Sequence, residues 1–173
     1  MPGTAVLVRP ITPEDCDAVA EIYAHYVTET VVTFDEVAPS VTDWRHRAEA
    51  LRAAGLPFLV VEAAGEVAGF GYASQFRPKP AYRHSVEDTV YLAPDRTGRG
   101  LGSLLLRAVL DGCVAAGKRQ VVAMITEGGE PSIALHRRHG FVEVGRLRSV
   151  GFKHDRWIDT LMFQRDLFAA PVG

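Results

Sequence analysis

The fold of this chain is decided by the stretch Val90-Tyr91-Leu92-Ala93-Pro94-Asp95-Arg96-Thr97-Gly98-Arg99-Gly100-Leu101-Gly102-Ser103. Its first residues are β-rich, and Pro94 then interrupts the extended run. The chain continues through three alternate glycines into an apolar pattern with helical period. Glycine adopts the left-handed backbone conformations that so tight a turn requires. The stretch therefore predicts a strand, a glycine turn and a helix that begins at about Leu101.

The glycine turn is suited to binding a phosphate group. Glycines let an anion approach the main chain, and a helix N-terminus adds about half a positive charge and several unpaired N–H donors. Arg96 and Arg99 flank the glycines and supply further positive charge. We therefore expect a pyrophosphate as the ligand of this turn.

Other glycine motifs fit this turn less well. A nucleotide-hydrolysing loop of the form GxxxxGK[ST] needs a lysine after the glycines, and none follows here. A dinucleotide-binding fold needs GxGxxG after the first strand and an acidic residue about 20 positions later, whereas this GxGxG follows about four strands. A glycine-rich turn without a ligand is the third alternative. The pyrophosphate of coenzyme A fits the pattern best.

The rest of the chain mixes strands and helices around this junction. A hairpin and later β-α-β connections predict the α/β (α+β) class, with a mixed, mostly antiparallel sheet covered by helices in one domain over residues 1–173. We expect strands at 6–9, 58–63, 67–75, 85–92, 120–125, 141–147 and 158–165. Helices are expected at 12–28, 40–55, 101–116 and 131–139, the third with Leu104, Leu105 and Ala108 facing inward.

Composition excludes several classes of function. The 19 basic and 21 acidic side chains give a formal charge of −2, which argues against bulk nucleic-acid binding. There is neither a long apolar run nor an N-terminal signal pattern, so we expect no membrane partner and a cytoplasmic protein. Cys16 and Cys113 lack partners at metal-ligand spacing, so no metal site is expected.

The glycine turn resembles that of the GNAT acetyltransferase superfamily, whose signature is [RQ]-x-x-G-x-[GA]. Gly100 and Gly102 stand in the glycine places, and Thr97 replaces the usual arginine or glutamine. Because such a turn works mainly through backbone amides, this replacement should weaken the match little. The resemblance implies acetyl-CoA as donor, bound by Val90, Tyr91, Leu92, Thr97, Gly98, Arg99, Gly100, Leu101, Gly102, Ser103 and Ser132.

A closer resemblance covers nearly the whole chain and points to the phosphinothricin and methionine sulfoximine N-acetyltransferases. It implies a seven-stranded GNAT fold with about four helices, a homodimer whose partner meets the region of Lys153, and phosphinothricin, methionine sulfoximine or methionine sulfone as acceptor. Gly129 stands where this family usually has an asparagine. The matching segments are IYAHYV at 22–27, VTFDE at 32–36, FRPKPAYRHSVED at 76–88, SIALH at 132–136 and LRSVGFK at 147–153.

Acetyl transfer to an amine by direct attack, with no covalent acetyl-enzyme, needs a group that takes the proton of the amine. Strand alternation places Glu87 and Thr89 on one face and Asp88 and Val90 on the other, so only one of the adjacent acids faces the cleft. The resemblance favours Glu87 as the catalytic carboxylate and acceptor contact. Alternatively, both acids solvate a sheet edge or pair with arginines.

The departing thiolate needs a proton, and the developing oxyanion needs a donor. His136 occupies the place where many GNAT enzymes have a proton-donating tyrosine, and histidine can serve as a general acid near neutral pH. The alternative is a helix histidine bonded to a backbone carbonyl. A backbone N–H near Val90 or Leu92 is expected to meet the oxyanion.

The segment Phe76 to His84 is expected to be an irregular loop, because it holds two prolines. Guanidinium groups bind carboxylate and phosphinate oxygens well, which makes the basic side chains of this loop candidates for binding an anionic acceptor. The alternative is that these side chains are solvated charges on the surface. Phe34 is expected to form an apolar wall of the same site. The predicted acceptor-binding residues of the loop are Arg77, Lys79, Tyr82 and Arg83.

Two other functions remain alternatives at this point. The chain could acetylate another amine, such as a protein N-terminus or a polyamine, although a basic loop disfavours a cationic acceptor. It could also be a noncatalytic module that binds acyl-CoA without turnover.

Overall fold

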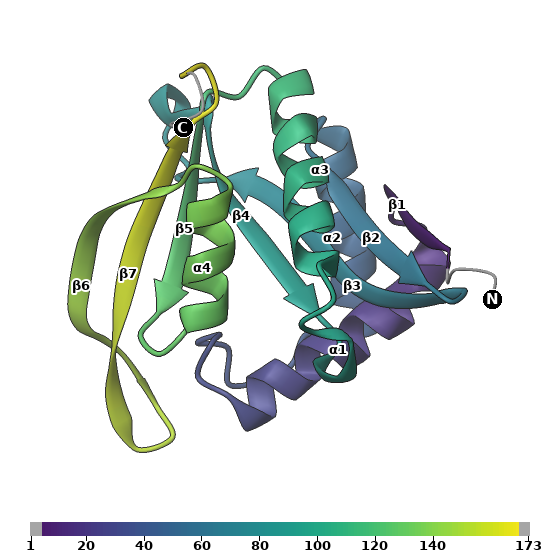
Figure 1. The fold of residues 1–173 in the computed structure, drawn as a ribbon, viewed down its shortest axis with the longest axis horizontal. Helices are drawn as coiled ribbons and strands as arrows, with labels where there is room; N and C mark the ends of the chain where they lie inside the picture. The colour runs from purple at the N-terminus through teal and green to yellow at the C-terminus, as the bar shows by residue number, and fades with distance from the viewer. Residues whose placement is uncertain (1–4, 170–173) are drawn as a thin grey trace.

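The computed structural model describes residues 5–169. Seven strands form one sheet in the order β1-β2-β3-β4-β5-β7-β6, and four longer helices pack on it (Figure 1). The strands are β1 Val6–Pro10, β2 Phe58–Ala63, β3 Glu66–Gln75, β4 Ser85–Leu92, β5 Gln120–Thr126, β6 Val142–Lys153 and β7 Arg156–Asp166. The helices are α1 Cys16–Glu29, α2 Val41–Ala53, α3 Leu101–Ala115 and α4 Glu130–Arg138, with short 3-10 turns η1 Pro13–Asp15, η2 Pro80–Tyr82 and η3 Pro94–Arg96.

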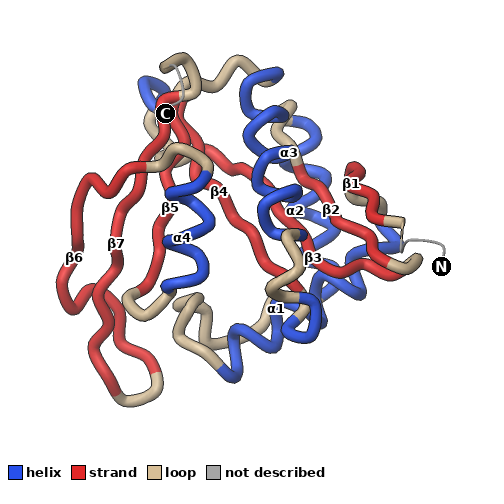
Figure 2. The backbone as a smooth tube through the Cα atoms, viewed as in Figure 1, coloured by secondary structure: helices blue, strands red, loops and turns tan. Residues whose placement is uncertain are grey.

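The sheet is mixed and mostly antiparallel, as expected from the sequence. Within residues 5–169, only the central pair β4 and β5 is parallel, and the other five neighbouring pairs are antiparallel. Figure 2 shows the strands of the sheet running between the helices. The predicted early hairpin, β2–β3, and the later crossovers through α3 and α4 are present, and a further hairpin, β6–β7, follows them.

The helices cover opposite faces of the sheet. On one face Trp44 of α2 packs edge-on against Phe70 of β3 with ring centroids 5.2 Å apart. On the other face a Cβ added to the neighbouring Gly71 would lie 3.2 Å from Val109 of α3. Adjacent residues of β3 thus point to opposite layers, as strand alternation requires.

One expectation for α3 was wrong. Leu105 is fully buried, but Leu104 is 50% exposed. The buried positions of α3 are Leu101, Leu105, Leu106, Val109, Leu110 and Cys113. The helical period of 3.6 residues turns Leu104 away from this stripe.

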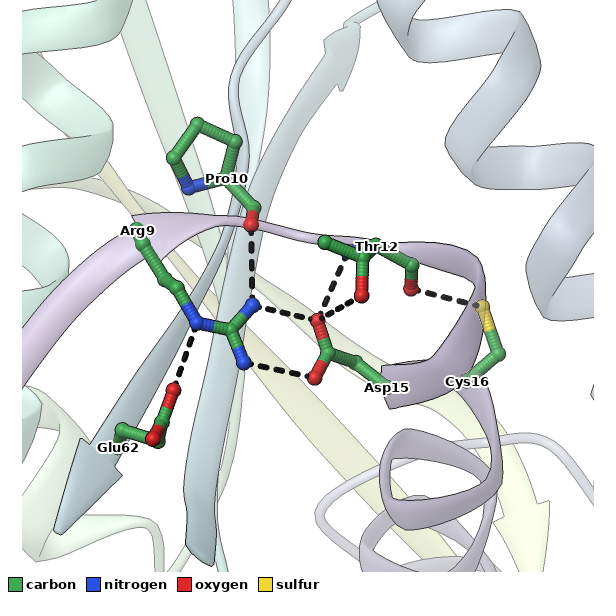
Figure 3. Close-up of polar contacts among 6 residues, drawn as sticks. All are labelled: Arg9, Pro10, Thr12, Asp15, Cys16 and Glu62. Carbon is green, nitrogen blue, oxygen red and sulfur yellow. Dashed lines mark hydrogen bonds and ion pairs between the residues drawn. The ribbon is translucent and has the colours of Figure 1, made fainter. Parts of the chain in front are cut away.

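The start of α1 is tied to the sheet by an ion-pair cluster (Figure 3). The Asp15 carboxylate accepts hydrogen bonds from the N–H and hydroxyl of Thr12, which is the geometry of a helix N-terminal cap. Arg9 of β1 donates to Asp15 at 2.7 Å and to Glu62 of β2 at 2.6 Å. These bonds raise the pKa of Arg9 and lower that of Asp15, so the cluster stays charged.

The sheet opens into a fork at its centre. β4 pairs with β5 over only three positions, Ser85 to Glu87 against Gln120 to Val122. Beyond Glu87, β4 stays paired with β3 as far as Leu92, while β5 stays paired with β7 as far as Thr126. The two strands therefore diverge toward their carboxyl ends, as the ribbon shows (Figure 1).

The C-terminal hairpin is longer than expected. The strand predicted at 141–147 runs to Lys153, because a bulge between Leu147 and Gly151 lets the pairing with β7 resume. At the bulge Ser149 has a left-handed φ of 49°, and its N–H donates to Asp159 at 2.7 Å. The hairpin extends beyond the rest of the sheet (Figure 1).

Among residues 5–169, none of the helices is long and apolar enough to cross a membrane.

Candidate active site

A cavity of about 1260 Å³ opens at the fork and is lined from both faces of the sheet. One wall includes Tyr23, Phe34, Arg47 and Tyr72; the other includes the glycine turn, Ser103, Ser132 and His136. Glu87 and Asp88 lie between the two walls on β4. A smaller cavity of about 270 Å³, beside α2 and Pro10, contains none of the predicted site residues.

The glycine turn is shaped to receive an anion. Gly98 and Gly100 have left-handed φ angles of 74° and 78°, and Gly100 is the N-cap of α3, where it has no side chain to satisfy the first helical amides. A Cβ at either glycine would have no heavy atom within 4 Å, so the space above the turn is open. The backbone therefore leaves donors of α3 free for a pyrophosphate.

Most of the predicted cofactor-binding residues line this cavity, but Arg99 and Leu101 do not. Leu101 is buried in the hydrophobic core, and Arg99 is exposed outside the cavity. Ser103, which does line the cavity, shares a hydrogen bond of 2.8 Å with Nε2 of His139. The residues found in the lining are Val90, Tyr91, Leu92, Thr97, Gly98, Gly100, Gly102, Ser103 and Ser132.

The backbone of β4 directs N–H groups into the fork, where they can donate hydrogen bonds. The N–H of Ala93 donates to Ala68 of β3 at 2.8 Å. Successive backbone groups of a strand point to alternate sides, so the N–H groups of Leu92 and Val90 point away from β3 and toward the fork. The carbonyl of Leu92 takes the same direction, because it accepts a hydrogen bond of 2.6 Å from Tyr26.

Glu87 stands at the last paired position before the fork opens. Burial raises its pKa, the neighbouring Asp88 raises it further, and Arg77 opposes the shift. Within the described part of the chain its carboxylate takes no side-chain hydrogen bond. Glu87 thus combines a raised pKa with oxygens that are free to meet a ligand.

Asp88 points to the opposite face, as alternation predicted, and pairs with His136 of α4. The expectation that only one of the two acids faces the cleft was wrong, because the cavity crosses the sheet and both acids line it. Nε2 of His136 lies 2.9 Å from Oδ2 of Asp88, and both side chains are almost completely buried. Nδ1 lies 2.7 Å from the carbonyl of Ser132, which can only accept, so Nδ1 carries a proton. Burial would lower the pKa of His136, but the hydrogen bond and charge of Asp88, with the Ser132 carbonyl, raise it.

The geometry of His136 matches the alternative of a helix histidine bonded to a backbone carbonyl. Both ring nitrogens are engaged within the protein, so a proton reaches the cavity from His136 only if Nε2 leaves Asp88. Oδ1 of Asp88 is buried and has no hydrogen-bond partner among residues 5–169. Sequence reasoning missed this pair, since 48 residues separate its members.

Phe34, the residue predicted to form an apolar wall, lines the cavity, and three contacts hold its loop in place. The ring of Phe34 lines the cavity and rests on Gly151, where any Cβ would collide with it. Lys153, only 4% exposed, donates to the carbonyl of Thr33 at 2.8 Å. The Tyr23 hydroxyl lies 2.7 Å from the Thr33 hydroxyl and donates to Asp35 at 2.6 Å. The loop after α1 is therefore fixed against both α1 and β6.

The structure does not bring the four loop residues into this cavity. Arg77, Lys79, Tyr82 and Arg83 are all exposed, and none of them lines it. Their loop precedes β4, whereas the glycine turn follows β4, so the two lie at opposite ends of that strand. The Arg77 guanidinium stacks on Phe76 at 4.8 Å. Contact between these residues and an acceptor stays a prediction.

Arg47 of α2 is a cavity residue that sequence reasoning missed. Its Nη1 donates to the Tyr72 hydroxyl at 3.0 Å, and its guanidinium lies 4.7 Å from the ring centroid of Trp44. The helical spacing of three residues from Trp44 to Arg47 was the available signal, since it places both on one side of α2. In the part of the chain that the structure describes, no group of three or more His, Cys, Asp or Glu side chains is placed to hold a metal.

The fork and the glycine turn occur in a chain that is similar to known acetyltransferases. The family described as "Acetyltransferase (GNAT) domain" matches residues 8–162. The chain belongs to this family of acetyltransferases, and its sheet and four helices form the GNAT fold.

Individual acetyltransferases are similar to this chain over nearly its whole length. A phosphinothricin N-acetyltransferase of Alcaligenes faecalis is 43% identical over 97% of this chain and 86% of its own length. An L-methionine sulfoximine/L-methionine sulfone acetyltransferase of Pseudomonas paraeruginosa is 35% identical over 92% of this chain and 94% of its own. The structure of a phosphinothricin acetyltransferase from Sinorhizobium meliloti in complex with acetyl-CoA superposes with a TM-score of 0.90, at 38% identity, covering 96% of this chain and 93% of that one.

Acetyl-CoA fits the residues that are present. Its pyrophosphate suits the open, uncapped N-terminus of α3, and its extended arm suits the fork between β4 and β5. When bound, acetyl-CoA supplies the activated acetyl group as a thioester.

Proposed function

We propose that this enzyme transfers the acetyl group of acetyl-CoA to the α-amino group of a small anionic amino acid, namely phosphinothricin, methionine sulfoximine or methionine sulfone. The observation that carries the proposal is the cavity that crosses the sheet at the fork. It connects the anion-binding turn of α3 on one side with Glu87 and the Phe34 wall on the other. A donor and an acceptor can therefore meet directly, with no covalent acetyl-enzyme.

Glu87 is the proposed base. An α-amino group is largely protonated near neutral pH and must lose a proton before it attacks. A carboxylate whose pKa is raised by burial takes that proton more readily than an ordinary glutamate does. In this proposal the N–H groups of Val90 and Leu92, directed into the fork, meet the carbonyl oxygen of the acetyl group.

His136 is the proposed proton donor for the departing thiolate. Its raised pKa favours the charged imidazolium, which has a proton to give. Because Nε2 is bonded to Asp88, the donation requires that this bond be broken. Replacement of His136 by Gln should lower kcat if the donation occurs; an unchanged kcat would leave His136 with the purely structural bonds described above.

An assay of thiol release with acetyl-CoA and a panel of amines tests the proposed function. We expect turnover with phosphinothricin, methionine sulfoximine and methionine sulfone, and much slower turnover with a polyamine and with an N-terminal peptide. If thiol is released only with the peptide or the polyamine, the proposed class of acceptor is wrong. Binding of acetyl-CoA without release for any amine would favour the noncatalytic module.

We also propose that the enzyme is a homodimer formed through the β6–β7 hairpin. β6 is an edge strand, and the hairpin exposes Val142, Val144, Val150, Phe152 and Trp157. Apolar residues gathered on an unpaired edge are typical of an interface. Because Leu147 and Val150 also line the cavity, a second copy seated on this face would lie next to the acceptor side. The single domain over 1–173 and the cytoplasmic location stay predictions.

A further inference from the structure

The acceptor side of the cavity contains a positive charge without a carboxylate partner. Arg47 is half-buried and lines the cavity, and it forms no ion pair with any acid among residues 5–169. Its one side-chain hydrogen bond in that part of the chain goes to the neutral hydroxyl of Tyr72. A guanidinium has five N–H donors, so most of them are left for a ligand or water.

The position of Arg47 is fixed rather than adaptable. Its guanidinium lies 4.7 Å from the centroid of Trp44 and 5.6 Å from that of Tyr72. Trp44 is completely buried and Tyr72 nearly so. A guanidinium supported on aromatic faces keeps its edge free for two parallel hydrogen bonds to a carboxylate. A side chain held in this way loses little entropy when it binds an anion.

The charges around Arg47 favour a ligand that carries both a negative and a positive group. The other basic groups that line the cavity are Arg138 and His136, both on α4, and His136 is already paired with Asp88. On the acceptor wall, Arg47 faces the cavity together with two acids, Glu87 of β4 and Asp35, whose carboxylate accepts a hydrogen bond from Tyr23. Tyr72 and Ser74 are alternate residues of β3, and Ser74 lies beside Glu87. Alternate residues are about 7 Å apart, which suits a small zwitterion.

We propose that Arg47, supported by Trp44 and oriented by Tyr72, binds the α-carboxylate of the acceptor amino acid while its amine faces Glu87. The assignment rests on the proposed function, because it concerns the acceptor side of the same cavity. It adds an anion-binding residue on α2 to the acceptor side of the cavity.

Kinetics with paired acceptors tests the assignment. The Arg47→Gln variant is compared with the wild-type protein on phosphinothricin and on its α-carboxamide, which lacks the carboxylate charge. We expect the variant to raise KM for the acid by roughly 10- to 100-fold, the loss typical of one charge-assisted contact, and to leave KM for the amide and for acetyl-CoA nearly unchanged. An equal change for acid and amide, or no change, would overturn the proposal.

Two further variants separate binding from folding. Tyr72→Phe keeps the charge of Arg47 and removes the hydroxyl that orients it, so a smaller rise in KM for the acid is expected. Arg52→Gln, an exposed change on the same helix that does not line this cavity, should leave KM for the acid as in the wild type. Thermal unfolding of each variant identifies any that fails to fold.

Direct binding distinguishes failure of this assignment from failure of the proposed function. If wild-type protein acetylates none of the panel, the proposed function is wrong. Calorimetric titration of wild type and Arg47→Gln with phosphinothricin then still tests Arg47. Weaker binding to the variant supports the carboxylate site, whereas equal binding to both, or no binding to either, overturns it.

Discussion

At the scale of single residues, two neighbouring acids of β4 have different environments. Glu87 is free in the cavity with a raised pKa, and Asp88 is bonded to His136 on the other face. Alternation of side chains along one strand is the cause. We therefore expect the replacement of each carboxylate to have a different effect.

Glu87→Gln should lower kcat by roughly 10²- to 10⁴-fold, because the proposed general base is lost. Acetyl-CoA affinity should be retained. In the wild type, kcat/KM for the acceptor should fall as pH drops through the Glu87 pKa, and this fall should lie above the ordinary value of 4.5, since burial raises the pKa. The control is Glu21→Gln, an exposed change on α1. Unaltered kinetics in the Glu87 variant would remove it from the mechanism.

Asp88→Asn should destabilise the protein in a pH-dependent way. The pKa of His136 is raised in the folded state, so its contribution to stability is full below its ordinary value of 6.5 and is lost as pH rises through the raised value. We expect a loss of about 2 kcal/mol in acid that shrinks in alkali. Denaturant unfolding at a series of pH values measures this loss of stability. The control is His25→Gln, a change at an exposed position of α1. A loss independent of pH would contradict the ion pair.

At the scale of elements, the glycine at the N-terminus of α3 has a matched control in the glycine that follows α2. Gly100 and Gly55 have φ angles of 78° and 68°, and a Cβ at either would touch nothing. Replacement by Ala should therefore cost each about 1 kcal/mol of stability from backbone strain. Only Gly100 lines the cavity, so Gly100→Ala alone should raise KM for acetyl-CoA. If both variants, or neither, changed that KM, the turn would not be the phosphate site.

The elements around the glycine turn were the most predictable part of the chain. The strand, Pro94, the glycines and the apolar period of α3 are local signals, and each follows from backbone chemistry. The contacts that complete the site are not local. Arg47 meets Tyr72 across 25 residues. The bulge near Ser149 lengthens β6 through pairing with β7, and no nearby pattern signals it.

The place of the loop at residues 76–84, outside the cavity, has a similar cause. Residues 76–84 are basic and aromatic, so composition suggested an anion site, but composition does not tell whether these side chains line the cavity. The turn of η2 and a hydrogen bond from Lys118 to the carbonyl of Arg83, 2.7 Å long, hold the loop on the outside. Topology, rather than residue type, decides which basic group lines the site.

At the scale of the whole molecule, the exposed hairpin predicts self-association. Phe152 is 53% and Trp157 65% exposed, and their rings lie 5.0 Å apart. Trp157→Lys should shift the protein from dimer to monomer in light scattering, because burying a lysine at an apolar contact is unfavourable. Val114→Lys, on the exposed side of α3, should leave the mass unchanged. A wild-type protein that is monomeric at high concentration would contradict the dimer.

The fork between β4 and β5 also has a kinetic consequence. In the proposed reaction the two reactants bind on opposite faces of the sheet in one cavity, so neither must leave before the other arrives. Both free cysteines, Cys16 and Cys113, are buried and neither lines this passage. Initial velocities measured at several fixed concentrations of one reactant should therefore give intersecting double-reciprocal lines, the pattern of a ternary complex, and product inhibition should reveal whether binding is ordered or random.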